Sequence, residues 1–184
     1  MLYLASQSPR RRQLLRQLKR PFRVVRSTHR ERIRKGIGPA ANAMWNAAGK
    51  AAKARLPRGA SGRVIGADTF LYFRGRILGK PATMAAARRM MRALSGRSHW
   101  VYTGVCVHPV PTGRRRVGYV RTKVTFKRLS DEAITRLFAR ATPLDKAGGY
   151  SLQADCGELI KRLEGSRTNV IGLPMEWLRQ RISY

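Results

Sequence analysis

Acidic residues are scarce in this chain of 184 residues, in which nine Asp and Glu stand against 39 Lys and Arg, for a formal net charge of +30. A protein this basic attracts nucleic acids and small phosphates alike. The charge therefore predicts salt-dependent, non-specific binding to nucleic acid, without making such binding the function. The scarcity has a second consequence, because each remaining carboxylate becomes more informative.

Cysteines and long apolar runs are also few. Cys106 and Cys156 lie far apart without a CxxC partner, so neither a zinc site nor a disulfide framework is indicated. No apolar run reaches the roughly 18 residues that cross a bilayer, and the apolar residues 1–5 are too few for a signal peptide. With 43% hydrophobic residues the chain is expected to fold. We therefore expect a soluble, reduced, cytoplasmic protein.

Hydrophobic periodicity predicts a mixture of strands and helices without a strict βαβ repeat. Strands are expected at 1–5, 21–27, 63–73, 99–110, 117–129 and 158–166. Helices are expected at 9–18, 40–56, 83–94, after Ser130 and at 174–182. The strand 63–73 is expected to be interrupted at Gly66. Because no linker, repeat or composition break divides residues 1–184, the sequence favours a single α/β domain with a mixed sheet.

Asp68 is the least expected carboxylate, since it follows Val-Ile-Gly-Ala in an apolar strand. A buried carboxylate is costly unless it is paired, hydrogen-bonded or bound to a metal. Two interpretations stay open: a core aspartate satisfied by backbone amides or an arginine, and a functional carboxylate. Glu31 leaves a similar choice, because Arg30 and Arg32 beside it would also make an ordinary surface salt bridge.

Several lysines stand on or near the ends of the predicted elements. Lys50 lies on the Ala-rich helix, Lys80 in the sequence Leu-Gly-Lys-Pro, and Lys146 in the glycine-containing turn at 145–153. Any one of these lysines is most often a solvated charge. Together, beside the buried Asp68, they are typical of a polyphosphate site.

The segment LASQSPRR adds a second source of positive charge. Ser8 fits a helix N-cap and Pro9 the first helical position. The backbone amides at a helix N-terminus attract anions. Ser6 and Ser8 add hydroxyl donors, and Arg10 and Arg11 add guanidinium groups suited to phosphate oxygens. The glycine-rich Walker pattern is not present, so this segment alone is a weak to moderate signal.

Ordered blocks of sequence carry a more specific signal. They are LASQSPRRRQLL (4–15), VIGADT (64–69), ILGKP (77–81), ALSGRSHWVYTGV (93–105), LDKAGGYSLQ (144–153) and EGSRTNVIGLP (164–174). Together they resemble the Maf family of nucleoside triphosphate pyrophosphatases. The resemblance implies a fold related to the inosine triphosphatases, with a long curved mixed sheet flanked by helices, a nucleotide cleft and often a homodimer.

The resemblance also implies a reaction and its residues. The reaction is hydrolysis of a nucleoside triphosphate between its α and β phosphates, with Mg²⁺ or Mn²⁺ as cofactor. Asp68 would be the general base, and Glu31 and Asp68 would bind the metal. The substrate would be bound by Ser8, Arg10, Arg11, Lys50, Thr69, Lys80, Lys146 and Gln153. Of these, Arg10, Thr69 and Gln153 match positions that select the nucleotide, and the last two sequence blocks resemble the branch that prefers dTTP and UTP.

The chain departs from the family pattern where acids are common. Thr28 and Arg30 stand near Glu31 in place of acids, and Thr83 and Ala86 follow the Gly-Lys-Pro motif. These departures predict a metal site with fewer carboxylates. Two alternatives to the enzyme follow: a basic nucleic-acid-binding protein, and a catalytically weak, nucleotide-binding or division-associated Maf-like protein.

Overall fold

The computed structural model describes residues 1–144, 146–152 and 157–182, which form an α/β fold. Its helices are α1 (Pro9–Arg16), α2 (Pro39–Ala52), α3 (Met84–Leu94), α4 (Asp131–Arg140), α5 (Arg167–Ile171) and α6 (Met175–Ile182), with a 3₁₀ turn at Ala147–Gly149. Its strands are β1 (Leu2–Leu4), β2 (Phe22–Val24), β3 (Gly62–Phe73), β4 (Arg76–Leu78), β5 (Ser98–Val110), β6 (Arg116–Phe126) and β7 (Ile160–Glu164). The predicted fold class is thereby confirmed.

The strands of the described residues form one mixed sheet of order β2-β1-β3-β5-β6-β7, with β4 paired to β3. β1 is parallel to both β2 and β3, whereas the β3–β4 and β6–β7 pairs are antiparallel. Contacts divide the chain into a first compact unit of residues 1–69, 102–120 and 168–184, and a second of residues 70–101 and 121–167. β3 and β5 contribute residues to both units, as does β6.

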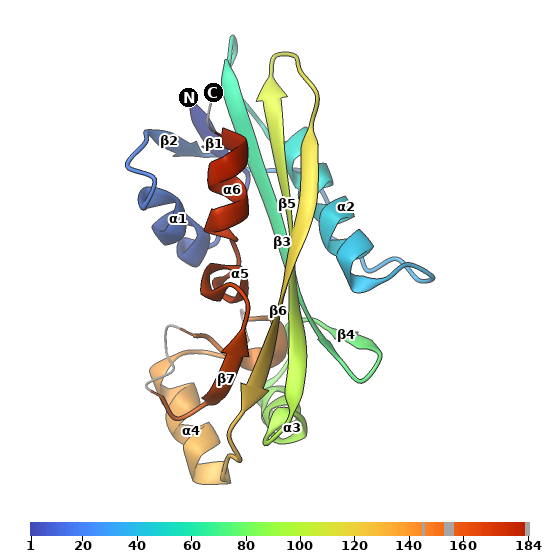
Figure 1. The fold of residues 1–184 in the computed structure, drawn as a ribbon, viewed down its shortest axis with the longest axis vertical. Coiled ribbons are helices and arrows are strands. Elements are labelled where there is room, and N and C mark those ends of the chain that lie inside the picture. The colour runs from blue at the N-terminus through green and yellow to red at the C-terminus, as the bar shows by residue number, and fades with distance from the viewer. Residues whose placement is uncertain (145, 153–156, 183–184) are drawn as a thin grey trace. The chain divides into compact units, whose positions relative to one another are not determined.

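The first unit packs a helical layer on each face of its strands (Figure 1). Alternation along β1 sends Leu2 and Leu4 into a core with Leu14 and Leu15 of α1 and with residues of α6. Tyr3, which points the other way, packs in a second cluster that includes residues of α2. The strand residues are thus buried on both faces.

Two glycines let α2 lie directly on the sheet. A Cβ at Gly66 of β3 would come 2.2 Å from the carbonyl oxygen of Ala47, and one at Gly104 of β5 would come 2.2 Å from the backbone of Ala43. The expected interruption of the strand at Gly66 is therefore wrong, because β3 runs unbroken from Gly62 to Phe73. The glycine serves close helix packing and not a break in the strand.

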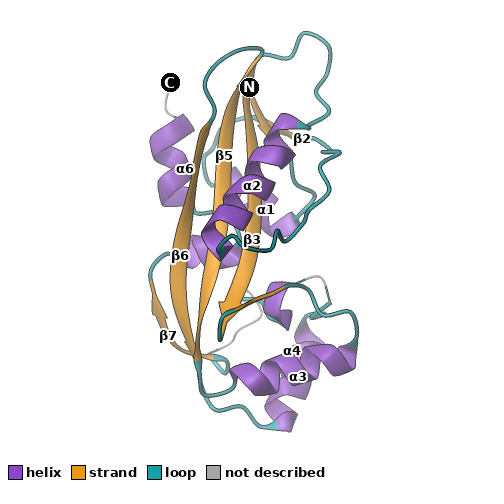
Figure 2. Ribbon diagram, turned by 90° about the vertical axis from the view of Figure 1, so that its right-hand side faces the viewer, coloured by secondary structure: helices purple, strands orange, loops and turns teal. Residues whose placement is uncertain are grey.

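The second unit holds α3 and α4 (Figure 2). It also holds an aromatic cluster around the buried His99. Thr83 and Ser130 cap α3 and α4 by accepting hydrogen bonds from the amides three residues on, as predicted for Ser130. His99 packs edge-on against Phe126 and Tyr150, and its Nε2 lies 2.8 Å from the Tyr150 hydroxyl. Burial lowers the pKa of His99 to about 3.

Most predicted elements are confirmed within a few residues, with three differences. α2 ends at Ala52 rather than at residue 56. Neither β4 nor the five-residue helix α5 was expected. None of the helices in residues 1–144, 146–152 and 157–182 combines the length and hydropathy needed to span a membrane.

Candidate active site

Asp68 lies on β3 with only 4% of its surface exposed, so its charge needs partners inside the protein. Both partners come from α2. The Lys50 ammonium donates to Oδ1 at 2.7 Å, and the Asn46 amide donates to Oδ2 at 2.8 Å. Both oxygens accept, which matches an ionised carboxylate. The core interpretation of Asp68 expected backbone amides or an arginine as partners, whereas the donors are the side chains of a lysine and an asparagine.

Lys50 joins Asp68 to a second carboxylate. Its Nζ also lies 2.7 Å from Oε1 of Glu31 and donates to the carbonyl oxygen of Ala67 at 3.1 Å. These three contacts match the three N–H donors of an ammonium group. The lysine is 7% exposed, whereas 56% of the Glu31 side chain is exposed. Glu31 is therefore the partner of Lys50 that solvent can reach.

Asparagines on α2 hold the loop that carries Glu31. The Oδ1 of Asn46 accepts a hydrogen bond from the Arg32 amide, and its Nδ2 donates to the Arg32 carbonyl oxygen. One helical turn earlier, Asn42 makes the same pair of bonds with Arg34. Because residues four apart share a helix face, Asn42, Asn46 and Lys50 form one polar stripe. This stripe ties the loop to the same helix that binds Asp68.

Arg11 anchors a second group of polar residues and is only 9% exposed. Its Nε donates to the Gly172 carbonyl oxygen at 2.7 Å, and its Nη1 and Nη2 donate to Ser6 and Thr69 at 3.2 and 3.0 Å. Desolvation lowers the pKa of Arg11, and the charges of Asp68 and Glu31 act against that shift. The guanidinium still stays charged at neutral pH.

The hydroxyl of Thr69 belongs to a directed chain of hydrogen bonds. Thr103 donates to the Asn169 carbonyl oxygen at 2.9 Å, and the two threonine hydroxyls lie 3.0 Å apart. Since a hydroxyl has one proton, Thr103 must accept from Thr69. Thr69 accepts from Arg11 in turn. The chain fixes the orientation of the Thr69 hydroxyl.

These two groups lie on opposite faces of β3, because Asp68 and Thr69 are neighbours in a strand. The pairing of β1 with β3 extends from Arg63 to Ile65 of β3, so both residues lie beyond it. The effect of the Asp68 charge on the pKa of Arg11 shows that the groups interact electrostatically. The structure therefore brings Glu31, Lys50 and Asp68 together, and Arg11 with Thr69.

The other predicted residues have different surroundings. Ser8 caps α1 without a side-chain hydrogen bond, and its amide donates to the Ser6 hydroxyl at 3.3 Å. Arg10 is half-buried on the first turn of α1. Lys80 and Lys146 belong to the second unit, where Lys80 is exposed and Lys146 donates to the Thr142 carbonyl oxygen. Gln153 lies outside the described residues.

The carboxylates fit only part of a metal site. Asp68 and Glu31 offer oxygen ligands around one ammonium group. Mg²⁺ is commonly held by one or two carboxylates together with substrate phosphates and water. Among the described residues no three His, Cys, Asp or Glu side chains converge. The donor set therefore suits a cation that takes further ligands from its substrate.

Sequence reasoning missed the asparagines and the threonine partner. Asn42 and Asn46 had a detectable signal, because they precede Lys50 at intervals of four in an otherwise Ala-rich helix. Thr103 had none, since it reaches Thr69 through the pairing of distant strands. Local spacing identifies one helix face, but it does not identify what that face contacts.

Comparison with known proteins finds one matching family model and several similar proteins that share one name. A family model described as Maf-like protein matches residues 1–183. A protein of Moorella thermoacetica named dTTP/UTP pyrophosphatase is 44% identical over 95% of this chain and 89% of its own length. Proteins of the same name from Pelotomaculum thermopropionicum and Thermococcus gammatolerans are 42% and 39% identical, over 95% and 96% of this chain and 91% and 92% of their own lengths.

Proposed function

Because this chain belongs to the Maf family, we propose that it hydrolyses dTTP and UTP to the nucleoside monophosphate and pyrophosphate. The relatives named dTTP/UTP pyrophosphatase support the substrate and the reaction. The observation that carries the proposal is the buried Asp68 carboxylate, held by Lys50 and Asn46 next to the more exposed Glu31. The predicted homodimer and cytoplasmic location stay predictions.

In this proposal Asp68 is the general base. Each of its oxygens accepts one hydrogen bond from α2, and a carboxylate oxygen has a second lone pair for a water molecule. Fixed partners on both oxygens keep the carboxylate in one orientation, which general base catalysis requires. The base takes a proton from water as that water attacks the α phosphorus. The leaving group is pyrophosphate.

Lys50 and Glu31 would bind the phosphate end of the site. All three donors of Lys50 have partners, and Glu31 is the exposed one. A phosphate oxygen can therefore replace Glu31 on the ammonium at small desolvation cost. We further propose that Glu31 and Asp68 hold Mg²⁺ or Mn²⁺, which when bound would neutralise charge on the phosphate oxygens.

Arg11 and Thr69 would position the substrate from the other face of β3. Three of the five N–H groups of Arg11 are used within the protein, so its main role is to fix Ser6 and Thr69. Thr69, oriented by its hydrogen-bond chain, and the half-buried Arg10 are the proposed contacts that distinguish one nucleotide from another. The roles predicted for Ser8, Lys80, Lys146 and Gln153 stay predictions.

The test is pyrophosphate release from dTTP, UTP, CTP and GTP, each with Mg²⁺ or Mn²⁺. We expect dTTP and UTP to be preferred. Asp68→Asn keeps the shape of the side chain but removes the base, so the rate is expected to fall by roughly 10²–10⁴-fold. Circular dichroism checks that the variant is folded.

Asp131→Asn is the matched control, since it makes the same chemical change on an exposed carboxylate that pairs with Arg92. Its rate is expected to stay within about twofold of the wild-type rate, as for surface substitutions generally. Equal losses in both variants, or no pyrophosphate from any nucleotide with either cation, would sink the proposal.

A further inference from the structure

A pocket of about 540 Å³ in the first unit is lined almost entirely by arginine. Five arginines surround it, with Val107 and Pro109 of β5 as its apolar lining: Arg63, Arg114, Arg115, Arg116 and Arg181. We call it the arginine pocket. Asp68 does not line it, and Arg63 lies five residues before Asp68 on β3, roughly 16 Å along a strand.

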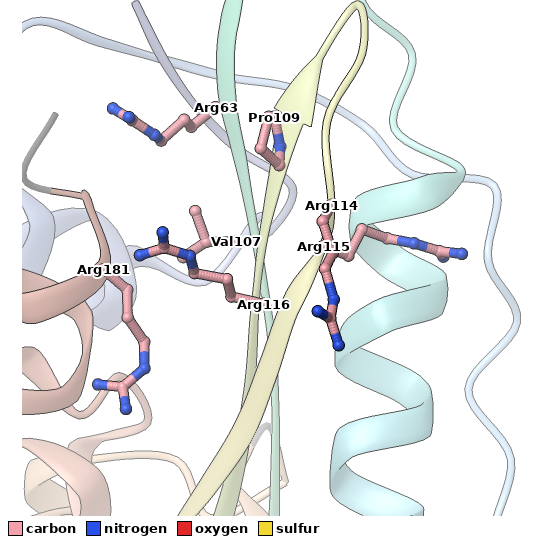
Figure 3. A pocket seen from close by; sticks show the side chains of 7 residues that line it. All are labelled: Arg63, Val107, Pro109, Arg114, Arg115, Arg116 and Arg181. Atoms are coloured by element: carbon pink, nitrogen blue, oxygen red, sulfur yellow. The ribbon is translucent and has the colours of Figure 1, made fainter.

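Three of the arginines come from different elements and lie on the same side of the strands. Figure 3 shows the side chains of Arg63, Arg116 and Arg181 on this side, and those of Arg114 and Arg115 on the other, next to α2. Strand alternation explains the grouping, because Arg63 is in phase with Ile65, whose face packs against α1 and α6. Residues far apart in sequence thus bring like charges to one surface.

Contacts within the protein hold two of these arginines in place. Arg63 donates through Nη1 to the Ile182 carbonyl oxygen at 3.2 Å. Arg181 donates through Nη1 to the Trp177 carbonyl oxygen at 3.1 Å, and its guanidinium lies 4.2 Å from the centre of the Trp177 ring. Both contacts are to neutral groups, so they orient the guanidinium groups without neutralising them. Arg116, which also lines the pocket, is exposed.

No carboxylate among the described residues of the first unit compensates this charge. The unit contains three acidic residues: Glu31, Asp68 and Glu176. The first two share Lys50, and Glu176 accepts a hydrogen bond from Thr168 at 2.8 Å. Guanidinium groups held close together without a counter-ion make a site for an anion.

We propose that the arginine pocket binds a small ligand that carries two or more linked phosphate groups, at a site separate from Asp68. Linked phosphates carry more negative charge and more acceptor oxygens than a single phosphate, which suits a pocket with several guanidinium groups. The volume is that of a small-molecule site. A free oligophosphate and a nucleoside polyphosphate share this chemistry, and the half-buried Pro109 offers an apolar contact that only the nucleoside part of the second could use.

The test is isothermal titration calorimetry of the wild-type protein and of Arg116→Glu with inorganic tripolyphosphate, in buffer without divalent cations. The side chain of Arg116 makes no hydrogen bond or ion pair with the described residues, so the variant is expected to fold. We expect one binding event to weaken by about tenfold or more, because a charge-assisted contact becomes a repulsion. Any event at the Asp68 site is expected to persist.

Arg58→Glu is the matched control, since it makes the same change in net charge at an exposed position outside the pocket. Equal weakening in both variants would assign the binding to overall charge and overturn the proposal. Orthophosphate binding as tightly as tripolyphosphate would also overturn it. So would loss of single-stranded DNA binding in Arg116→Glu with unchanged tripolyphosphate affinity, since the occupant would then be nucleic acid.

One further ligand, dTTP, distinguishes a nucleoside polyphosphate from a free oligophosphate. Titration of Asp68→Asn with dTTP and with tripolyphosphate compares a nucleoside polyphosphate with a free one, while hydrolysis is blocked. The comparison concerns the binding event that is weakened by Arg116→Glu. If dTTP binds more tightly than tripolyphosphate in that event, a nucleoside polyphosphate is supported as the ligand. Equal affinities would support a free oligophosphate. This titration does not depend on the proposed hydrolysis.

Discussion

The Asp68 cluster (Glu31, Lys50 and Asp68) and the arginine pocket lie in the same unit of the protein but differ in how their charges are compensated. In the cluster, Lys50 sits between Asp68 and Glu31, each 2.7 Å from its Nζ. In the pocket, the contacts of Arg63 and Arg181 with described residues are to neutral groups. The difference follows from burial, because a buried charge without a partner is far more costly than one that water can solvate.

The comparison explains how a chain of net charge +30 can fold. Two of its few acids are placed where a buried cation or a helix N-terminus needs them, namely Asp68 and Asp131. The excess positive charge stays at the surface, where water and salt reduce its cost. The two regions are therefore expected to respond differently to mutation, pH and salt.

Removal of the shared cation gives the largest expected effect on stability. Lys50→Met leaves the buried Asp68 carboxylate without its ammonium partner and is expected to lower the free energy of unfolding by about 3–5 kcal/mol. Lys53→Met makes the same change at the exposed end of α2 and is expected to change it by less than about 0.5 kcal/mol. Urea unfolding measures both. Similar values for the two variants would show that the Asp68 cluster is no more coupled than the surface.

Variants of the two asparagines on α2 distinguish an effect on stability from an effect on the rate of pyrophosphate release. Asn46→Ala and Asn42→Ala each remove hydrogen bonds between a buried asparagine and part-buried backbone groups of the loop, at a cost of about 0.5–1.5 kcal/mol for each bond lost. Only Asn46 also binds Asp68. We expect pyrophosphate release to fall by about tenfold more in Asn46→Ala than in Asn42→Ala. Equal rates in two folded variants would mean that the Asn46 contact does not position the base.

His99 in the second unit is expected to make the stability of the fold depend on pH below about 6.5. The pKa of His99 is lowered to about 3 by burial, whereas an unfolded histidine has a pKa of about 6.5. Its neutral form is compatible with folding above pH 6.5, and stability is lost as the pH falls from 6.5 towards 3, because the unfolded chain binds the proton. The slope is about 1.4 kcal/mol per pH unit.

Urea unfolding between pH 7 and pH 4.5 measures this slope. His99→Phe fills the same aromatic cluster without a titrating group, so its stability is expected to depend less on pH. The control is His108→Asn, at a half-buried position where the pKa is also lowered by burial. An unchanged slope in His99→Phe would show that another group sets the acid limit.

Salt gives the smallest expected difference. Raising NaCl from 10 mM to 0.5 M is expected to stabilise wild type and Lys50→Met alike, because it screens the repulsion of the net positive charge. The gap between them is expected to change by less than about 0.5 kcal/mol, since buried pairs are screened little. A gap that closes with salt would mean that Lys50 behaves as a surface charge.

The sequence predicted the elements of the Asp68 cluster better than their contacts. A carboxylate in an apolar strand had to be paired, and Lys50 on a nearby helix was a candidate, so the two were expected at one site. The pairing through Asn46 depends on how α2 lies on β3, which two glycines on separate strands determine. That arrangement is tertiary, and no local pattern predicts it.

The missed elements have local physical causes. β4 follows a two-residue turn in which Arg74 and Gly75 have φ of 48° and 79°. Such a hairpin turn normally has Asn or Asp before Gly, so Arg74 weakened the hairpin signal and the short strand after the turn was not recognised. α5 has five residues, too few to show a helical period. The arginine pocket was missed because Arg63, Arg116 and Arg181, which share one side of the strands (Figure 3), come from β3, β6 and α6.

The most direct test of the central claim is ³¹P nuclear magnetic resonance of dTTP incubated with the wild-type protein and Mg²⁺. The proposed hydrolysis at the α phosphorus predicts dTMP and pyrophosphate in equal amounts, and Asp68→Asn is expected to form them at least about 10²-fold more slowly. Formation of dTDP and orthophosphate, or equal rates in wild type and Asp68→Asn, would contradict the account.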